Sequence, residues 1–195
     1  FDRSFSTHTI ILVGVVFSMF ASSLISLVIA FSGEKLRSIT FWNMGSLAGT
    51  SYTQGLILLA ALILCGGVMI FRGRELNAFA IGEDNAHHIG IPVRRVKLEV
   101  LVGVSILIGV CVSIGGTIGF VGLIVPHISR LITGPNHRKL LPFATCGGAI
   151  FLMLCDLLAR TVLSPMELPI GVVTSLLGAA TFVWIIFRRK RQGAL

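Results

Sequence analysis

The sequence predicts an all-α membrane protein, a polytopic bundle of transmembrane helices. Of its 195 residues, 54% are apolar and only 12% are charged, whereas an average soluble domain has about 25% charged residues. The mean hydropathy is +0.94. The apolar residues form runs that approach the length of about 20 residues that a membrane-spanning helix needs. A transmembrane barrel would instead show short alternating strands.

Long apolar runs predict five spans. They cover about residues 9–31, 55–71, 98–114, 141–163 and 169–187. Small residues in the first run, such as Gly14, Ser18 and Ser22, allow a neighbouring helix to approach closely. Phe41 and Trp42 follow in a polar stretch, and such aromatic residues suit a membrane–water interface.

A sixth apolar segment, residues 117–130, is too short to stand alone in lipid. From Gly119 to Ser129 it measures about 16 Å as a helix, roughly half of the hydrocarbon core. Pro126 removes the hydrogen bond to the carbonyl of Gly122, so we expect this helix to be kinked or partly unwound. Its backbone groups need neighbours or water, which predicts a place inside the bundle near a pathway.

The basic residues indicate how the chain crosses the membrane. If the short segment crosses, 13 Lys and Arg residues lie on the cytoplasmic side and 3 outside; if it does not, the counts are 7 and 9. Lys and Arg concentrate in cytoplasmic loops. The sequence therefore predicts six crossings with both ends of this chain in the cytoplasm. The net charge of +8 follows from this topology, and no nucleic-acid partner is expected.

No metal site is expected. The four cysteines lie in apolar runs without a CxxC spacing, which predicts small buried apolar residues: Cys65, Cys111, Cys146 and Cys155. His87 and His88 are adjacent and would point apart on a helix, so they are not expected to share a metal.

The polar interval 75–92 predicts a short amphipathic helix on the cytoplasmic side. Its apolar residues recur at helical spacing: Leu76, Phe79, Ala80, Ala86 and Ile89. Gly90 and Pro92 provide a stop signal. The segment is either a linker on the bilayer surface or a docking helix for a cytoplasmic partner. Glu83 and Asp84 argue mildly against adhesion to anionic lipid.

Asp156 and Arg160 lie four residues apart near the outer end of the fifth crossing. They predict either an ion pair that makes Arg160 less costly near the membrane, or a positive anchor for an acidic external partner. Glu167 follows in the outer loop, where a solvated charge is expected.

His127 and Arg130 follow Pro126 in the short segment, where the freed backbone and these side chains could hydrogen-bond to one another. A structural role is favoured, and a proton relay is the alternative. The other acids in the spans are few, mainly Asp156 with Glu99 at a cytoplasmic end, so no chain of carboxylates is visible. A GxxxxGK[ST] phosphate loop is also absent from the sequence, so the chain is not expected to bind ATP in the P-loop manner.

Five stretches together resemble the permease subunits of ATP-binding-cassette importers for iron-siderophores, haem and cobalamin. They are FWNMGSLAG (41–49), LNAFAIGEDNAHHIGIP (76–92), GTIGFVGLIVPHISRLI (116–132), HRKLLP (137–142) and CDLLARTVLSPMELPIGVVTSLLGAATFVWII (155–186). The resemblance covers essentially the whole chain. Members of the family have roughly ten helices, which implies that residues 1–195 are the C-terminal six, with a cytoplasmic coupling segment at 75–92.

The resemblance also implies roles for individual residues. The coupling segment, with Gly82 and Glu83 as the "GE" of the family, would dock into the ATPase subunit through Leu76, Phe79, Gly82, Glu83, Ala86 and Gly90. Arg160 falls on the arginine ahead of ELPIG, which would meet an acidic residue of the substrate-binding protein. Ser6 and Thr7 fall near the cytoplasmic gate. The GFVGLIVPH signature, with Arg130 after it, is interpreted as structural: Gly119, Gly122, Pro126, His127 and Arg130.

As a member of this family the chain would be a non-catalytic, multi-pass subunit in the cytoplasmic membrane of a prokaryote. It would bind no cofactor itself, since a separate ATPase subunit uses the ATP. Its other partners would be a second permease subunit, an extracytoplasmic binding protein and the bilayer. The expected cargo is an iron-siderophore, with haem or cobalamin as alternatives. Rival hypotheses are an ion-coupled carrier that uses Asp156, His127 and Arg130, and a structural subunit without a pathway.

Overall fold

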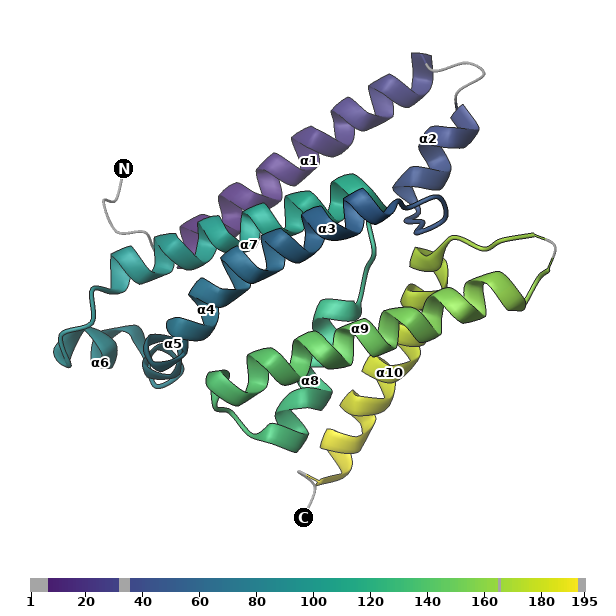
Figure 1. Ribbon diagram of the computed structural model, residues 1–195. Helices are drawn as coiled ribbons and strands as arrows, with labels where there is room; N and C mark the ends of the chain where they lie inside the picture. Colours follow the sequence, from purple (N-terminus) through teal and green to yellow (C-terminus); the bar gives the residue numbers. More distant parts are fainter. Residues whose placement is uncertain (1–6, 32–35, 165, 193–195) are drawn as a thin grey trace. The chain divides into compact units, whose positions relative to one another are not determined.

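The computed structural model describes residues 7–31, 36–164 and 166–192, and every element in these residues is a helix. The predicted all-α class is therefore confirmed. The chain divides into two units, residues 1–41 and 42–195, which are described separately. Figure 1 shows the elements in chain order: α1 (Thr7–Phe31), α2 (Leu36–Asn43), α3 (Tyr52–Ala61), η2 (Leu62–Gly66), α4 (Gly67–Phe71), α5 (Gly73–Phe79), α6 (Glu83–His88), α7 (Val93–Gly115), α8 (Val121–Thr133), α9 (His137–Thr161) and α10 (Ile170–Gln192).

Among the described residues, four helical stretches are long and apolar enough to cross a membrane. They are Thr9–Ala30, Tyr52–Phe71, Val93–Gly115 and His137–Thr161. Two shorter apolar helices are Val121–Thr133 and Ile170–Val183. These six segments match the six expected from the sequence, while the number of crossings and the orientation stay predictions.

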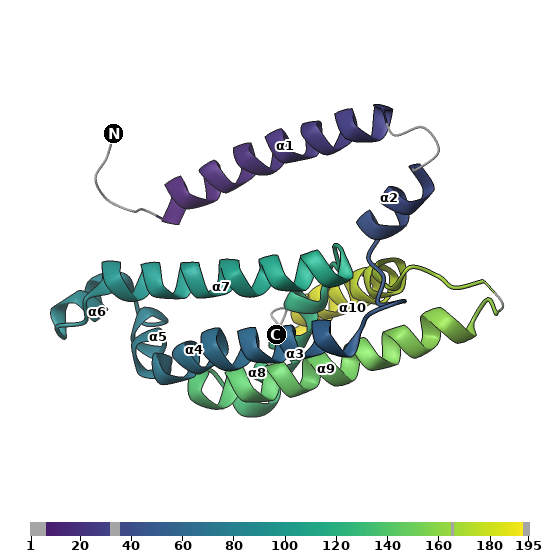
Figure 2. The same cartoon turned by 45° about the horizontal axis from the view of Figure 1, so that its top comes forward.

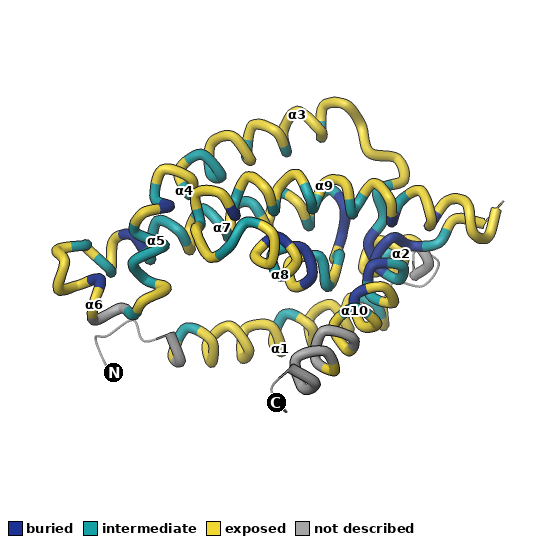
Figure 3. The backbone as a smooth tube through the Cα atoms, turned by 90° about the horizontal axis from the view of Figure 1, so that it is seen from below, coloured by how far each residue is buried: buried dark blue, intermediate teal, exposed yellow. Residues whose placement is uncertain are grey.

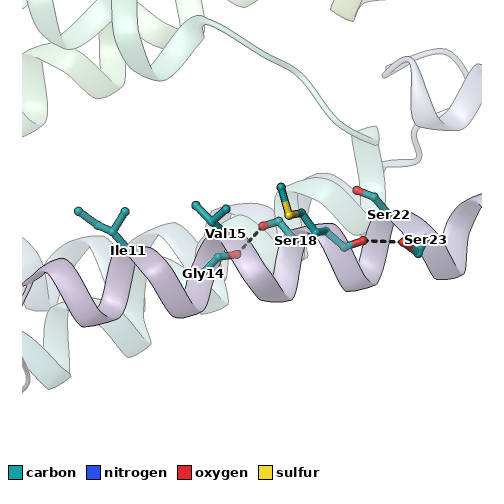
Figure 4. Close-up of a pocket in the computed structure, with 7 residues that line it drawn as sticks. Ile11, Gly14, Val15, Ser18, Ser22 and Ser23 are labelled. Carbon is teal, nitrogen blue, oxygen red and sulfur yellow. Dashed lines mark hydrogen bonds between the residues drawn. The ribbon is translucent and has the colours of Figure 1, made fainter. Parts of the chain in front are cut away.

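The first unit contains α1, a helix in which the hydroxyls of Ser18, Ser23 and Ser26 donate to backbone carbonyls of the preceding turn. Ser18 donates to the carbonyl of Gly14 at 2.8 Å, and Ser23 donates to that of Met19 at 3.0 Å. A shallow hollow runs along this face where side chains are small (Figure 4). Because the hydroxyls bond within the helix, they can lie in an apolar environment.

In the second unit, α3, η2 and α4 form one continuous helix beside α7 (Figures 1 and 2). Ser51 and Gln54 begin it with a reciprocal capping box, at 3.3 Å and 2.8 Å. The middle segment η2 is a π-helix of five residues. A π-helical turn holds one residue more than an α-helical turn and is uncommon.

The buried core of the second unit lies mainly where α8, α9 and α10 pack together. Ser129 of α8, Cys155 of α9 and Thr174 of α10 are each at most 2% exposed. Gly147 in α9 lies against α8, where a Cβ would make an ordinary contact 3.5 Å from a methyl of Val125. Small residues at such crossings are typical of helices that pack in membranes.

Many large apolar side chains of the described residues are exposed, and Figure 3 shows that exposed residues predominate along the helices. Such a surface suits contact with lipid or with further helices. It also corrects the prediction of four buried cysteines: Cys155 is buried and Cys65 is half-buried, but Cys111 and Cys146 are exposed. A small apolar thiol is equally stable on a surface that faces lipid.

Candidate functional site

The coupling segment, residues 75–92, contains two short helices instead of the single predicted helix. The chain leaves α5 after Phe79 and enters α6 at Glu83. Between them Gly82 adopts φ 133°, which side-chain-bearing residues rarely adopt and no helix contains. The apolar spacing continued across this break, so periodicity alone missed it.

Gly90 ends α6 as predicted. It adopts φ 83°, and its N–H donates to the carbonyl of His87 at 3.0 Å. The N–H of Ile91 donates to the carbonyl of Ala86 at 3.2 Å. This pair of bonds is the Schellman arrangement that satisfies the last carbonyls of a helix.

The predicted docking residues divide into those that hold the segment and those that face outward. Ala86 is fully buried, and Leu76 and Phe79 are half-buried. Ala86 therefore packs within this chain, while its role in docking stays a prediction. Ile81 and Ile89 are exposed, 75% and 70%. Ile81 was missed because it lies in the turn, outside the helical pattern; the side chain of Glu83 is not described.

An ion-pair cluster joins the start of the coupling segment to α7. Arg72 pairs with Glu75 at 3.2 Å and with Glu99 of α7 at 2.8 Å. Glu99 also pairs with Arg95 at 3.0 Å. The hydrogen bonds to Glu75 and then to Glu99 raise the pKa of Arg72, so its guanidinium stays charged. The sequence had singled out Glu99 only as an acid at the end of a span.

A second link joins the coupling segment to the beginning of α9. The side-chain carbonyl of Asn77 accepts from the backbone N–H of His137 at 2.8 Å and lies 2.8 Å from Nδ1 of the same residue. The amide nitrogen of Asn77 donates to Oδ1 of Asn136 at 3.1 Å. Asn136 itself accepts from the N–H of Arg138 at 3.1 Å. Two N–H groups that a helix start leaves without a partner are thereby satisfied.

The short predicted segment forms α8, and its irregular part lies before the helix. Residues 116–119 are not helical, and Phe120 adopts φ 65°, which is uncommon for a residue other than glycine. The helix then continues through Pro126, so the predicted unwinding occurs ahead of the proline. His127 is half-buried and Arg130 is exposed. In the described residues their side chains make no hydrogen bond, to each other or elsewhere.

The backbones of three stretches meet closely beside the start of α10. A Cβ on Gly116 would lie 2.0 Å from the carbonyl oxygen of Trp42, and one on Gly171 would lie 2.2 Å from that of Met44. Only glycine fits such contacts. The N–H of Ser46 donates to the carbonyl of Gly115 at 2.9 Å. An open groove of about 500 Å³ lies here, lined by Asn43, Met44, Thr117, Gly119, Gly171, Val172, Ser175 and Leu176.

At the far end of α9, the predicted ion pair forms. Nε of Arg160 donates to Oδ2 of Asp156 at 2.8 Å, and 45% of the arginine side chain is exposed. Glu167 is exposed as expected. The N–H of Leu168 donates to the carbonyl of Ala159 at 3.0 Å and returns the loop to the helix. Ser6 lies outside the described residues, and the side chain of Thr7 is not described.

Long apolar helices, two shorter apolar helices and polar links at the helix ends are features of a polytopic membrane protein. The FecCD transport family matches residues 1–188. The chain belongs to that family, which confirms the resemblance inferred from the sequence.

Relatives that are named as permeases agree with this assignment. The chain is 44% identical over 190 residues to an uncharacterized ABC transporter permease protein of Bacillus subtilis, covering 97% of this chain and 54% of the relative. It is 41% identical over 160 residues to a hemin transport system permease of Yersinia pestis, covering 82% and 48%. It is 40% identical over 190 residues to a vitamin B12 import permease of Vibrio cholerae, covering 94% and 55%. The chain thus spans about half the length of the curated relatives it matches.

A solved structure supports the fold. A transporter assigned to the metal-chelate type of ABC transporters, in an inward-facing conformation, matches with a TM-score of 0.86 and 35% identity. The match covers 94% of this chain and 60% of that one.

Proposed function

We propose that this chain is the C-terminal part of a permease subunit of an ATP-binding-cassette importer, and that its cargo is an iron-siderophore. The relatives named as permeases for hemin and vitamin B12 and the metal-chelate transporter support a cargo that is a large metal complex. Iron chelates are the most frequent cargo of the family, while haem and cobalamin are the alternatives. The permease itself catalyses no reaction.

The observation that carries this proposal is the pair of short helices α5 and α6, of which α5 is joined to α7 by the ion pair of Arg72 and to α9 by the hydrogen bonds of Asn77. An exposed turn with Ile81 beside a fastened helix suits docking by a cytoplasmic ATPase subunit. Movement of that subunit on ATP binding would displace α5, and the links would transmit the displacement to the spans. A second permease subunit would complete the pathway, and an extracytoplasmic protein would deliver the cargo.

The docking step is tested with variants of the coupling segment. Gly82→Pro cannot keep φ 133°, because proline fixes φ near −65°, and Glu83→Lys reverses a charge. Both are expected to abolish co-purification of the ATPase from detergent extracts while the permease stays folded. Glu167→Lys, a charge reversal in the predicted outer loop, serves as the control and should leave co-purification intact. Retention of the ATPase by both coupling variants would refute the docking surface.

Cargo and energy source are tested together in proteoliposomes that contain the full importer. Uptake of a labelled ferric siderophore is expected with ATP and not with a proton or sodium gradient alone. Haem or cobalamin uptake in its place would correct the cargo. Gradient-driven uptake would favour the ion-coupled carrier. The structure gives that carrier no connected set of coupling groups among the described residues, because Asp156 pairs with Arg160, and the side chains of His127 and Arg130 form no hydrogen bond with Asp156 or Arg160.

A further inference from the structure

We infer that Asn77 is a positioning residue. By holding the beginning of α9, it connects the coupling segment to Arg160 at the other end of that helix. This inference rests on the proposed function, since it assumes a partner at each end of α9. It assigns to one side chain the transfer of movement between those partners.

Asn77 binds α9 at the point where the helix begins. Its carbonyl oxygen accepts from the backbone N–H of His137, and its amide donates to Asn136, the N-cap residue. These bonds join residues 59 and 60 positions apart in sequence. One short side chain therefore holds both the cap and the first residue of α9.

The backbones on either side of this link are also close. Gly73, the buried first residue of α5, lies against Arg138, where a Cβ would be 2.8 Å from Cγ of the arginine. Figures 1 and 2 show α5 beside this end of α9. Because contact and hydrogen bonds occur together, α5 cannot shift away without pulling on the beginning of α9.

From that beginning, α9 is one helix of 25 residues, from His137 to Thr161, about 37 Å at 1.5 Å per residue. It keeps its helical course through Pro142, although proline removes one hydrogen bond of the first turns. Arg160 lies in its last turn and is ion-paired to Asp156 of the same helix. The ion pair that holds this guanidinium group therefore lies within α9. A displacement of α5 reaches this arginine, and binding at the arginine reaches α5 in return, because coupling between two sites is reciprocal.

The experiment uses the complete permease assembled with its ATPase and its binding protein in lipid nanodiscs. ATP hydrolysis is measured with and without the binding protein. Asn77→Ala is expected to assemble and to hydrolyse ATP at the basal rate, but stimulation by the binding protein should fall about fivefold or more, within the usual range of coupling between sites. Asn77→Asp keeps the oxygen that accepts from His137, and its charge suits a helix N-terminus, so it should retain most of the stimulation.

Thr145→Val provides the control, because it removes a hydrogen bond that stays within α9, from Thr145 to the carbonyl of Leu141. It should leave stimulation unchanged. Full stimulation in Asn77→Ala overturns the inference, and so does loss of assembly in that variant, which would indicate a purely structural role. If the unaltered permease binds no ATPase, the proposed function fails first and the inference fails with it.

Discussion

The two ends of α9 are built differently. At its beginning, Asn77 reaches across from α5, and Arg72 links the same segment to Glu99 of α7. At its end, Arg160 pairs with Asp156 of its own helix and stays 45% exposed. The first end is fastened to neighbouring elements, whereas the second leaves a cation available. The beginning of α9 is therefore suited to transmit movement from α5, and its end is suited to bind an acidic surface.

The largest loss of stability is expected at the fastened end. Gly73→Ala places a Cβ 2.8 Å from Cγ of Arg138, and overpacking of this kind typically costs about 1–3 kcal/mol. The free energy of unfolding in mixed detergent micelles measures the effect. Gly55→Ala is the control, since nothing lies within 4 Å of its Cβ. Equal stability of the two variants would mean that α5 and α9 are not in close contact.

A smaller loss is expected for Glu99→Gln. The amide keeps the shape of the side chain but no longer offers a carboxylate to Arg72 and Arg95. About a quarter of Glu99 is exposed, and salt screens such charges. The melting temperature should therefore fall less than for Gly73→Ala, and the difference from the unaltered protein should shrink at 1 M NaCl. A difference that does not depend on salt would refute the electrostatic role.

The smallest effect on stability is expected at the open end. Arg160→Ala removes one exposed ion pair within a helix, and such pairs contribute little. Its melting temperature should be unchanged, while affinity for the binding protein should fall about tenfold, mainly through slower association at low salt. Arg160→Lys keeps the charge and should restore part of the affinity. Unchanged affinity in Arg160→Ala would remove the anchor from the proposed mechanism.

Local patterns predicted much of the fold and part of the site. Hydropathy placed the apolar segments near their observed positions, because the bilayer sets a length that the sequence must match. The Asp156–Arg160 pair followed from helical spacing alone. The break at Gly82 was missed because apolar spacing continued across it. The contact between Asn77 and His137 has no sequence signal, since it joins residues 60 positions apart through tertiary packing.

The exposure of Cys111 and Cys146 marks a different limit. The apolar run around each residue predicted an apolar environment, but a membrane helix finds such an environment in lipid or in further subunits as well as in its own core. Burial within one chain therefore does not follow from hydropathy.

The π-helix η2 has a consequence for how this span tolerates changes in length. Its wider turn accommodates one extra residue, so α3 and α4 present the faces that they would have in one uninterrupted α-helix. Removing one residue from Leu62–Gly66 would restore an α-helix and keep both flanking faces against their neighbours. The same deletion elsewhere in the span would turn every following side chain to the wrong face. This span therefore has one place where evolution can lose a residue without repacking the helix.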